Sequence, residues 1–292
     1  MELIRDKDII FEDSNLENLF KLENFPVFMG CMDNLNPQDD LYEDFILDIS
    51  KTSGIVQVRN LIQLEVLYDA EHSSGTVGKI WHDHHKAFAD FMSSSTNPKR
   101  VFEIGGLHGI LSKYYNQNNE ISSWTIIEPN PIPVDDCPAN FIEGFFGNDF
   151  ELDEEFDAYV HSHTLEHIYN VQDKLSEIYR VLRPNGDILI STPFLYPIHG
   201  HPDDFFRPTP SWYYKALKNC GFKEIRVVPL FWGPFSTGLT TSGVGPFQNV
   251  RKKIALFLDL LLVKYKQKKL TKSEIEQILM PTSTVLAVQA TK

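Results

Sequence analysis

One carboxylate and three glycines interrupt an apolar run at residues 101–115, which reads VFEIGGLHGILSKYY. Glu103 stands in a segment that is otherwise typical of a buried strand, and Gly105, Gly106 and Gly109 follow before helical spacing resumes. Glycines at a strand-to-helix turn let a ligand approach the backbone, and the helix that follows offers unpaired N–H groups at its N-terminus. The stretch therefore predicts a turn that holds a cofactor.

A second carboxylate, Glu128, closes the apolar segment WTIIEP, 25 residues after Glu103. An acid at the end of the next strand is placed to accept hydrogen bonds from ribose hydroxyl groups. Glycines after a strand are also common as plain turn residues, so the turn alone is weak evidence for a ligand. Together with Glu128 it favours a cofactor site, and a side chain at Gly105 is expected to enter the space that the cofactor fills.

Histidines supply the candidate general bases. His163 and His167 lie in the segment HSHTLEHI, directly after a predicted strand. An imidazole there can take a proton from an acceptor hydroxyl or an acidic carbon, because its pKa lies near neutrality. The alternatives are that His163 packs beneath the cofactor and that Glu166 with His167 caps the following helix. His201, in the later segment YPIHGHPDDFFRPTP, is the second candidate base.

That later segment, residues 196–210, is rich in proline and in polar residues. It follows a predicted strand, at the edge where open sheets bind their substrates. A metal pair from His201 and Asp203 is one alternative, and a solvated turn in which Asp204 pairs with Arg207 is favoured over that pair. The predicted acceptor-binding residues are His199, Asp203, Asp204 and Arg207.

The elements that position these residues begin near residue 99. From there, short β-rich apolar segments alternate with amphipathic helical spacing, which is typical of a mostly parallel sheet covered by helices. The predicted strands are RVFEIG, SWTIIEP, FDAYVHS, GDILIST, FKEIRVVPL and TSTVLAVQA. Residues 1–80 carry short mixed segments and turn-forming residues, which favours a small irregular or helical accessory region ahead of a cofactor-binding domain at 81–292.

Composition limits the classes of function. With 292 residues, 42% of them hydrophobic and 23% charged, the chain can bury a full core. Its net charge of −13 disfavours nucleic acid as a partner and favours a small-molecule acceptor. The three cysteines lie far apart, which argues against a disulfide framework or a thiolate metal site. Without a secretory signal or an apolar run long enough to span a membrane, a cytoplasmic protein is expected.

The spacing of the acid and the glycines separates two cofactor classes. A dinucleotide turn reads Gly-x-Gly-x-x-Gly, whereas Glu103 here opens Glu-x-Gly-Gly-x-x-Gly. This pattern resembles the first motif of class I S-adenosylmethionine-dependent methyltransferases, and FDAYVHSHTLEHI and YRVLRPNGDILISTP resemble later segments of that family. The resemblance implies a Rossmann-like, mostly parallel seven-stranded sheet with helices on both faces. It also implies S-adenosylmethionine as cofactor, held by Glu103, Gly105, Gly106, Gly109, Glu128 and His163.

The turn departs from the family pattern at Leu107, which replaces the usual middle glycine, and its EIGG sequence resembles variants in the sugar C-methyltransferase branch. Residues 53–92 resemble the part of those enzymes that helps to cover the cofactor. The likeness implies that a sugar or nucleotide-linked sugar of surface-polysaccharide biosynthesis is methylated, on oxygen or on carbon. Where the branch has zinc-binding cysteines, this chain has Ser50 and Ser53, so no structural zinc is expected.

Histidines also cluster in HDHH, residues 82–85. On a helix, His82 and His85 share a face while His84 diverges, which favours a solvated or cofactor-lid helix over a metal cluster. No metal site is therefore predicted.

Residues 251–272 hold eight basic residues and one acid around a core of ten mainly apolar residues. Within a predicted inserted helical segment near 245–280, they favour a helix packed on the domain or on a partner subunit, so a homodimer stays open. The alternative is a helix on an anionic membrane surface.

Three classes of function stay open from the sequence. A methyltransferase is favoured by the motifs above. An NAD-type oxidoreductase is disfavoured by the glycine spacing. A non-catalytic module that keeps the cofactor fold and binds a membrane surface or a protein is suggested by Leu107 and the basic segment.

Overall fold

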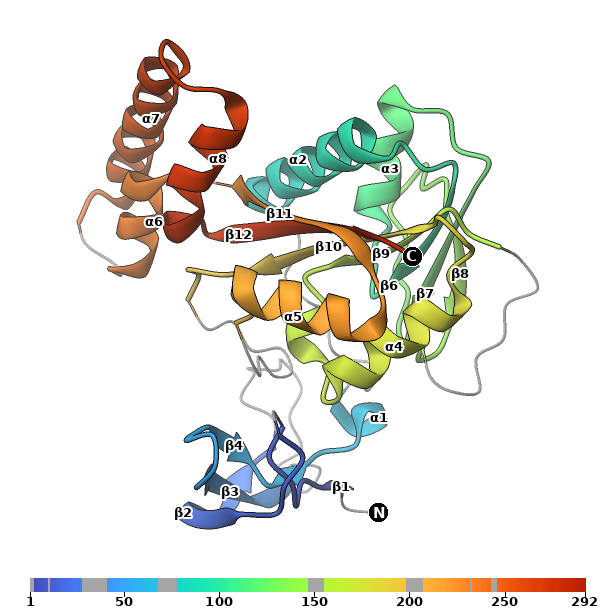
Figure 1. Ribbon diagram of the computed structural model, residues 1–292, viewed down its shortest axis with the longest axis vertical. Coiled ribbons are helices and arrows are strands. Elements are labelled where there is room, and N and C mark those ends of the chain that lie inside the picture. Colours follow the sequence, from blue (N-terminus) through green and yellow to red (C-terminus); the bar gives the residue numbers. More distant parts are fainter. Residues whose placement is uncertain are drawn as a thin grey trace. The chain divides into compact units, whose positions relative to one another are not determined.

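The computed structural model describes residues 3–9, 11–27, 41–67, 78–146, 155–197, 207–231, 233–242 and 246–292. The chain divides into two units (Figure 1). The first consists of Met1–Ser74 and Gly200–Pro202, and the second consists of Gly75–His199 and Asp203–Lys292.

Antiparallel strands make up most of the first unit. Three strands form a sheet in the order β2-β3-β4, and β1 pairs with β5. The prediction of an irregular or helical region is wrong here, because these strands are held by pairing between distant residues, such as Leu16 with Ser50, which leaves little local periodicity. The elements are β1 (Leu3–Ile4), β2 (Leu16–Pro26), β3 (Tyr42–Ser50), β4 (Val56–Val58), β5 (Asn60–Leu61) and α1 (Leu64–Leu67).

Ser50 and Ser53 shape the turn between β3 and β4. They stand at the positions where the enzymes that the sequence resembles have zinc-binding cysteines. The Ser50 hydroxyl accepts hydrogen bonds from the backbone N–H groups of Thr52 and Ser53, both at 3.1 Å. The Ser53 hydroxyl donates to the carboxylate of Asp8. Hydroxyl hydrogen bonds therefore organise this turn, and Gly54 completes it with a φ of +76°.

A seven-stranded sheet forms the centre of the second unit, in the order β11-β12-β10-β9-β6-β7-β8. The neighbours from β10 to β8 are parallel, and β12 runs antiparallel to both β10 and β11. This confirms the predicted mostly parallel seven-stranded sheet. The strands are β6 (Arg100–Ile104), β7 (Ser123–Glu128), β8 (Asn140–Glu143), β9 (Ala158–Ser162), β10 (Asp187–Pro193), β11 (Lys223–Phe231) and β12 (Val285–Thr291).

Helices cover both faces of this sheet (Figure 1). On one face, Leu175 of α4 and Leu217 of α5 pack into a core with the strands, and on the other Phe88 of α2 and Leu111 of α3 do so. The helices are α2 (Lys79–Ser95), α3 (Ile110–Asn118), α4 (Val171–Val181), α5 (Pro210–Cys220), α6 (Pro234–Thr241), α7 (Gln248–Gln267) and α8 (Lys272–Leu279), with single 3₁₀ turns at Leu165–His167 and Met280–Thr282.

The chain reverses its direction across the sheet at β6. It adds β7 and β8 on one side of that strand, then returns to place β9 and β10 on the other side. In open α/β sheets, ligands bind outside the carboxyl ends of the strands at such a reversal. The loops that follow β6 and β9 are therefore the place to look for a site.

Candidate active site

The turn between β6 and α3 contains the three glycines of the motif. Gly105 and Gly109 have φ values of +75° and +66°, in the left-handed region that favours glycine. A Cβ on Gly105 would lie 2.6 Å from the hydroxyl oxygen of Thr164, and a Cβ on Gly106 would lie 2.9 Å from the carboxyl carbon of Glu103. Neighbouring protein atoms thus require glycine here. A Cβ on Gly105 would meet Thr164 first, which adds a second reason for glycine to the expected approach of the cofactor.

Glu103 is packed against this turn and is only 1% exposed. Its Oε2 accepts a hydrogen bond of 2.9 Å from the indole N–H of Trp124. Burial raises the pKa of Glu103 to about 7, although the bond from Trp124 opposes the shift. The carboxyl group therefore changes its protonation state near neutral pH. It supports the turn because it packs against Gly106.

We expect Glu103→Gln to change the pH dependence of stability. The folded protein binds the Glu103 proton more tightly than the unfolded chain, so this carboxyl lowers the free energy of unfolding as the pH rises from about 4.5 to about 7. The amide stays neutral and can still accept from Trp124. Urea unfolding of both proteins should show the variant gaining roughly 2–3 kcal/mol relative to the wild type across that range. An equal difference at both ends would contradict the raised pKa.

Glu128 ends β7 beside the same turn. Its Oε2 accepts a hydrogen bond of 3.1 Å from the backbone N–H of Leu107, and its Oε1 accepts one of 3.4 Å from that of Asn130. Burial raises the pKa of Glu128, and these backbone bonds oppose the shift. Each carboxylate oxygen has a further lone pair, so the group is oriented and can still accept hydrogen bonds from a ligand.

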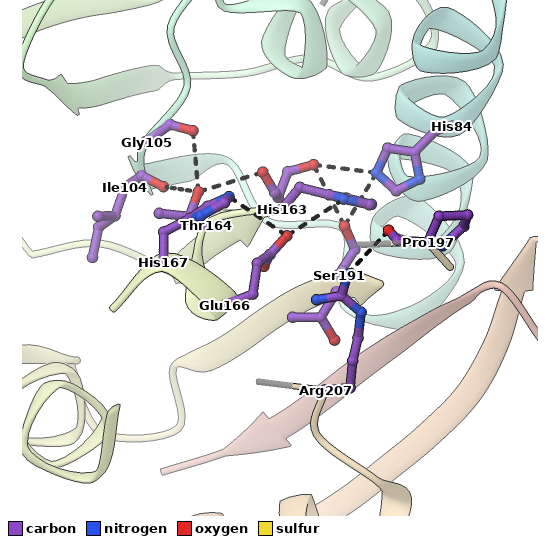
Figure 2. Close-up of polar contacts among 12 residues, drawn as sticks. His84, Ile104, Gly105, His163, Thr164, Glu166, His167, Ser191, Pro197 and Arg207 are labelled. Carbon is purple, nitrogen blue, oxygen red and sulfur yellow. Dashed lines mark hydrogen bonds and ion pairs between the residues drawn. The ribbon is translucent and has the colours of Figure 1, made fainter. Parts of the chain in front are cut away.

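The turn that follows β9 meets the glycine turn (Figure 2). The Thr164 hydroxyl lies 3.2 Å from the carbonyl oxygen of Ile104, to which it donates. His163 has a φ of +53°, which is uncommon for a residue other than glycine, and its backbone N–H bonds to the carbonyl of Ser191 at 2.9 Å. Strained backbone of this kind clusters at ligand sites. The structure thus brings the predicted residues Gly105 and His163 to adjoining turns.

Glu166 lies between two of the predicted histidines (Figure 2). Its Oε1 is 3.6 Å from Nδ1 of His163 and 3.9 Å from Nε2 of His167. Glu166 is fully buried, whereas the His167 side chain is 13% exposed. A carboxylate behind an imidazole helps to fix the orientation of the ring. The His163 side chain is 9% exposed, slightly less than that of His167.

His84 on α2 contributes to the site region, where the sequence favoured a solvated or cofactor-lid helix for HDHH. The solvated alternative is wrong for His84, which is 3% exposed and whose Nε2 lies 3.2 Å from Oγ of Ser191 and 3.3 Å from Oγ of Ser162. Burial holds the pKa of His84 well below its usual value, so a neutral ring links α2 to β9 and β10. The helical spacing of His84, Phe88 and Met92, all buried, is the signal that could have revealed it.

The other histidines of HDHH have separate partners. His82 Nδ1 lies 2.9 Å from the hydroxyl of Tyr114, and His85 Nδ1 lies 2.8 Å from the carbonyl oxygen of Trp81. Among the residues that the structure describes, no three His, Cys, Asp or Glu side chains are grouped as metal ligands.

The predicted acceptor loop is described only at its ends. Nη2 of Arg207 donates a hydrogen bond of 3.3 Å to the carbonyl of Pro197, so it bridges the two ends of the loop (Figure 2). The predicted residues His199, His201, Asp203 and Asp204 lie outside the described residues.

Two solved methyltransferase structures are similar to this chain at low sequence identity. Human N-acetylserotonin methyltransferase, solved with SAM, is 15% identical with a TM-score of 0.44, and the match covers 72% of this chain and 51% of that one. A SAM-dependent methyltransferase from Thermotoga maritima is 14% identical with a TM-score of 0.45, and the match covers 73% and 94%. No curated protein matches the sequence.

A third structure supports the fold, and a family model matches part of the chain. A chain of the complex between the Haloferax volcanii Trm112 methyltransferase activator and a methyltransferase is 16% identical with a TM-score of 0.51, and the match covers 78% of this chain and 97% of that one. Residues 102–190 match the family described as Methyltransferase domain. The matched segment contains the glycine turn, Glu128 and the turn after β9. Residues 102–190 thus resemble a methyltransferase domain, and the likeness to the solved structure shows a Rossmann-like fold.

Proposed function

We propose that this protein is an S-adenosylmethionine-dependent methyltransferase that acts on a small polar acceptor. The observation that carries the proposal is the joint geometry of the glycine turn and Glu128, whose carboxylate is held by the backbone of Leu107 at the carboxyl ends of β6 and β7. When bound, S-adenosylmethionine supplies an electrophilic methyl group on a sulfonium. The match of residues 102–190 to a methyltransferase domain supports this class over a dehydrogenase.

The residues around the turn suit this cofactor. Glu128 offers oriented acceptor oxygens to the ribose hydroxyls, and Gly105 and Gly109 give the turn the positive φ values that bring its backbone close to a ligand. The N-terminus of α3 adds free N–H groups. Glu103 and His163 support the turn, since both are nearly buried against it or against the adjoining turn.

For the acceptor we propose a sugar or nucleotide-linked sugar of surface-polysaccharide biosynthesis. The support is the resemblance of the EIGG turn to the sugar C-methyltransferase branch, and the density of polar residues in the loop after β10. Methylation of a hydroxyl or of an acidic carbon releases one proton, which His167 accepts in this proposal, with His201 as the second candidate. The residues proposed to orient the acceptor are His199, Asp203, Asp204 and Arg207.

Replacement of Glu128 tests the cofactor site. Glu128→Ala should weaken binding of S-adenosylhomocysteine by roughly 1.5–3 kcal/mol, the range for hydrogen bonds to a charged group. Isothermal titration measures this loss. Glu128→Gln keeps an acceptor for the Leu107 N–H and should lose less, which separates ligand contact from support of the turn.

Glu143 provides a matched control. It pairs with Glu128 in the register of β7 and β8 and is exposed, so Glu143→Ala should leave the affinity unchanged. Titration of the wild-type protein with NAD completes the set. Tight binding of NAD without binding of S-adenosylhomocysteine would overturn the proposed function, and an unchanged dissociation constant in Glu128→Ala would remove Glu128 from the site.

A further inference from the structure

α7 carries large apolar side chains on its solvent-facing side. They recur at intervals of three or four residues, so they lie on one face of the helix. Each is between 47% and 62% exposed. A contiguous exposed apolar surface of this kind marks an interaction site. We name it the α7 stripe, and its members are Val250, Ile254, Phe257, Leu261 and Tyr265.

The opposite side of α7 is anchored to the domain. Figure 1 shows α7 beside α6 and α8, and α8 in turn contacts β11. Ala255 and Asp259 are buried there. The Asp259 carboxylate accepts hydrogen bonds from the backbone N–H groups of Phe235 and Ser236, at 3.0 and 2.9 Å, at the start of α6. This anchor sets the rotation of α7, so the stripe is directed outward.

Basic side chains surround the stripe. Residues 251–272 carry a net charge of +7, which leaves −20 for the rest of the chain. The single acid of the segment is Asp259, which faces inward. Lys253 and Lys264 are exposed and stand one helical turn from Phe257 and Leu261, respectively. Within the described part of the chain, Lys272 is the one basic residue of the segment with an ion-pair partner, Glu276 at 3.9 Å.

We propose that α7 lies on the surface of an anionic lipid bilayer. The α7 stripe is then buried at the boundary between headgroups and acyl chains, and the lysines of α7 contact the headgroups. Exposed apolar residues combined with unpaired lysines suit this surface, because both burial and electrostatic attraction contribute to binding. Lysine side chains are long enough to reach the headgroups from beside the stripe. No helix among the described residues is long and apolar enough to cross a membrane, so α7 lies along the surface.

A second copy of the chain fits the stripe less well. A symmetric contact between two α7 helices would bring two segments of +7 together, and the outer face of α7 has no acid to compensate them. Packing on the domain, which the sequence favoured, accounts for the side of α7 that holds Ala255 and Asp259. It leaves the stripe uncovered.

Vesicle flotation of the full chain tests the proposal. The protein should float with vesicles of phosphatidylglycerol and phosphatidylcholine, and less so as salt is raised, but not with phosphatidylcholine alone. Lys253→Glu combined with Lys264→Glu should weaken partition about tenfold or more. Phe257→Ser combined with Leu261→Ser should weaken it to a similar degree. Lys215→Glu combined with Lys218→Glu, on exposed positions of α5, changes the charge equally and should bind like the wild type.

The opposite results would overturn the proposal. These are failure to float with anionic vesicles, equal flotation with neutral vesicles, or equal losses in the α5 control. Light scattering without lipid measures whether two copies of the chain associate. A dimer that dissociates in the Phe257→Ser/Leu261→Ser variant would assign the stripe to a subunit interface instead. Circular dichroism verifies that each variant is folded, which is expected because all four substituted residues of α7 are exposed.

Discussion

Gly105→Val is expected to weaken binding of S-adenosylhomocysteine by at least about a hundredfold, a loss of about 2.8 kcal/mol. The residue has a φ of +75°, where a β-branched side chain is strained by roughly 1–3 kcal/mol. Its Cβ would also stand 2.6 Å from the Thr164 hydroxyl oxygen and 2.7 Å from its methyl carbon. The turn must therefore shift, and the bond from the Leu107 N–H to Glu128 shifts with it. Isothermal titration of the folded variant measures the loss.

A compensating change separates collision from backbone strain. In Gly105→Ala combined with Thr164→Ala, the hydroxyl and methyl groups that the new Cβ meets are absent, and the nearest remaining atom of residue 164 lies 3.2 Å away. The double variant should bind more tightly than Gly105→Ala alone. Gly54→Val is the control: it has the same φ, at +76°, but open space around its Cβ, and it lies in the other unit. Wild-type affinity in a folded Gly105→Val protein would place the cofactor elsewhere.

The central sheet could be predicted where its strands are buried. All six strands expected from the sequence are present in the second unit. They could be predicted because short apolar segments bounded by turn residues are typical of buried strands. β8 (Asn140–Glu143) was missed. It is a four-residue edge strand with exposed polar ends, held in place by pairing with β7, and such pairing leaves no pattern in its own sequence. The strands of the first unit were missed for the same reason.

The candidate site also contains residues that the local sequence predicts and residues that only distant contacts bring in. Gly105, Gly109 and Glu128 could be predicted because a strand-to-helix turn and the end of the next strand are encoded within a few residues each. The spacing of His84 with Phe88 and Met92 could have indicated that His84 is buried. Its partners could not be predicted, since Ser162 and Ser191 are 78 and 107 residues away along the chain. The spacing of histidines on one helix does not indicate which distant strands will provide their hydrogen-bond partners. Only the packing of α2 on the sheet brings these side chains together.

The roles of Thr164 and Glu166 required the same three-dimensional information. Thr164 reaches back to the backbone of Ile104, a contact between residues 60 apart. Glu166 belongs to a single 3₁₀ turn, whose tight geometry turns its carboxylate toward His163 and His167. The sequence placed these histidines near the site, and the structure adds the acid that lies between them.

His167→Asn is expected to lower turnover by roughly 10²–10⁴-fold, the usual contribution of a positioned general base. Asparagine is similar in size but cannot take a proton at neutral pH. Because methyl transfer otherwise needs mainly alignment, the affinity for S-adenosylhomocysteine should stay nearly unchanged. The assay is a screen of nucleotide sugars, read by the mass increment of the product and by release of S-adenosylhomocysteine. His82→Asn is a matched control on α2, since His82 bonds to Tyr114 and should not affect turnover.

Two further variants decide between the candidate bases. If His201 is the base, His201→Asn should show the large loss and His167→Asn should not, and Glu166→Gln should then be neutral as well. If His167 is the base, Glu166→Gln should reduce turnover in part, because its carboxylate lies 3.9 Å from Nε2 of His167 and orients the ring. Near wild-type turnover in both histidine variants on the same acceptor would show that neither takes the proton. Alignment alone would then account for catalysis, which suits an acceptor that needs little help from a base, such as an amine, better than a sugar hydroxyl.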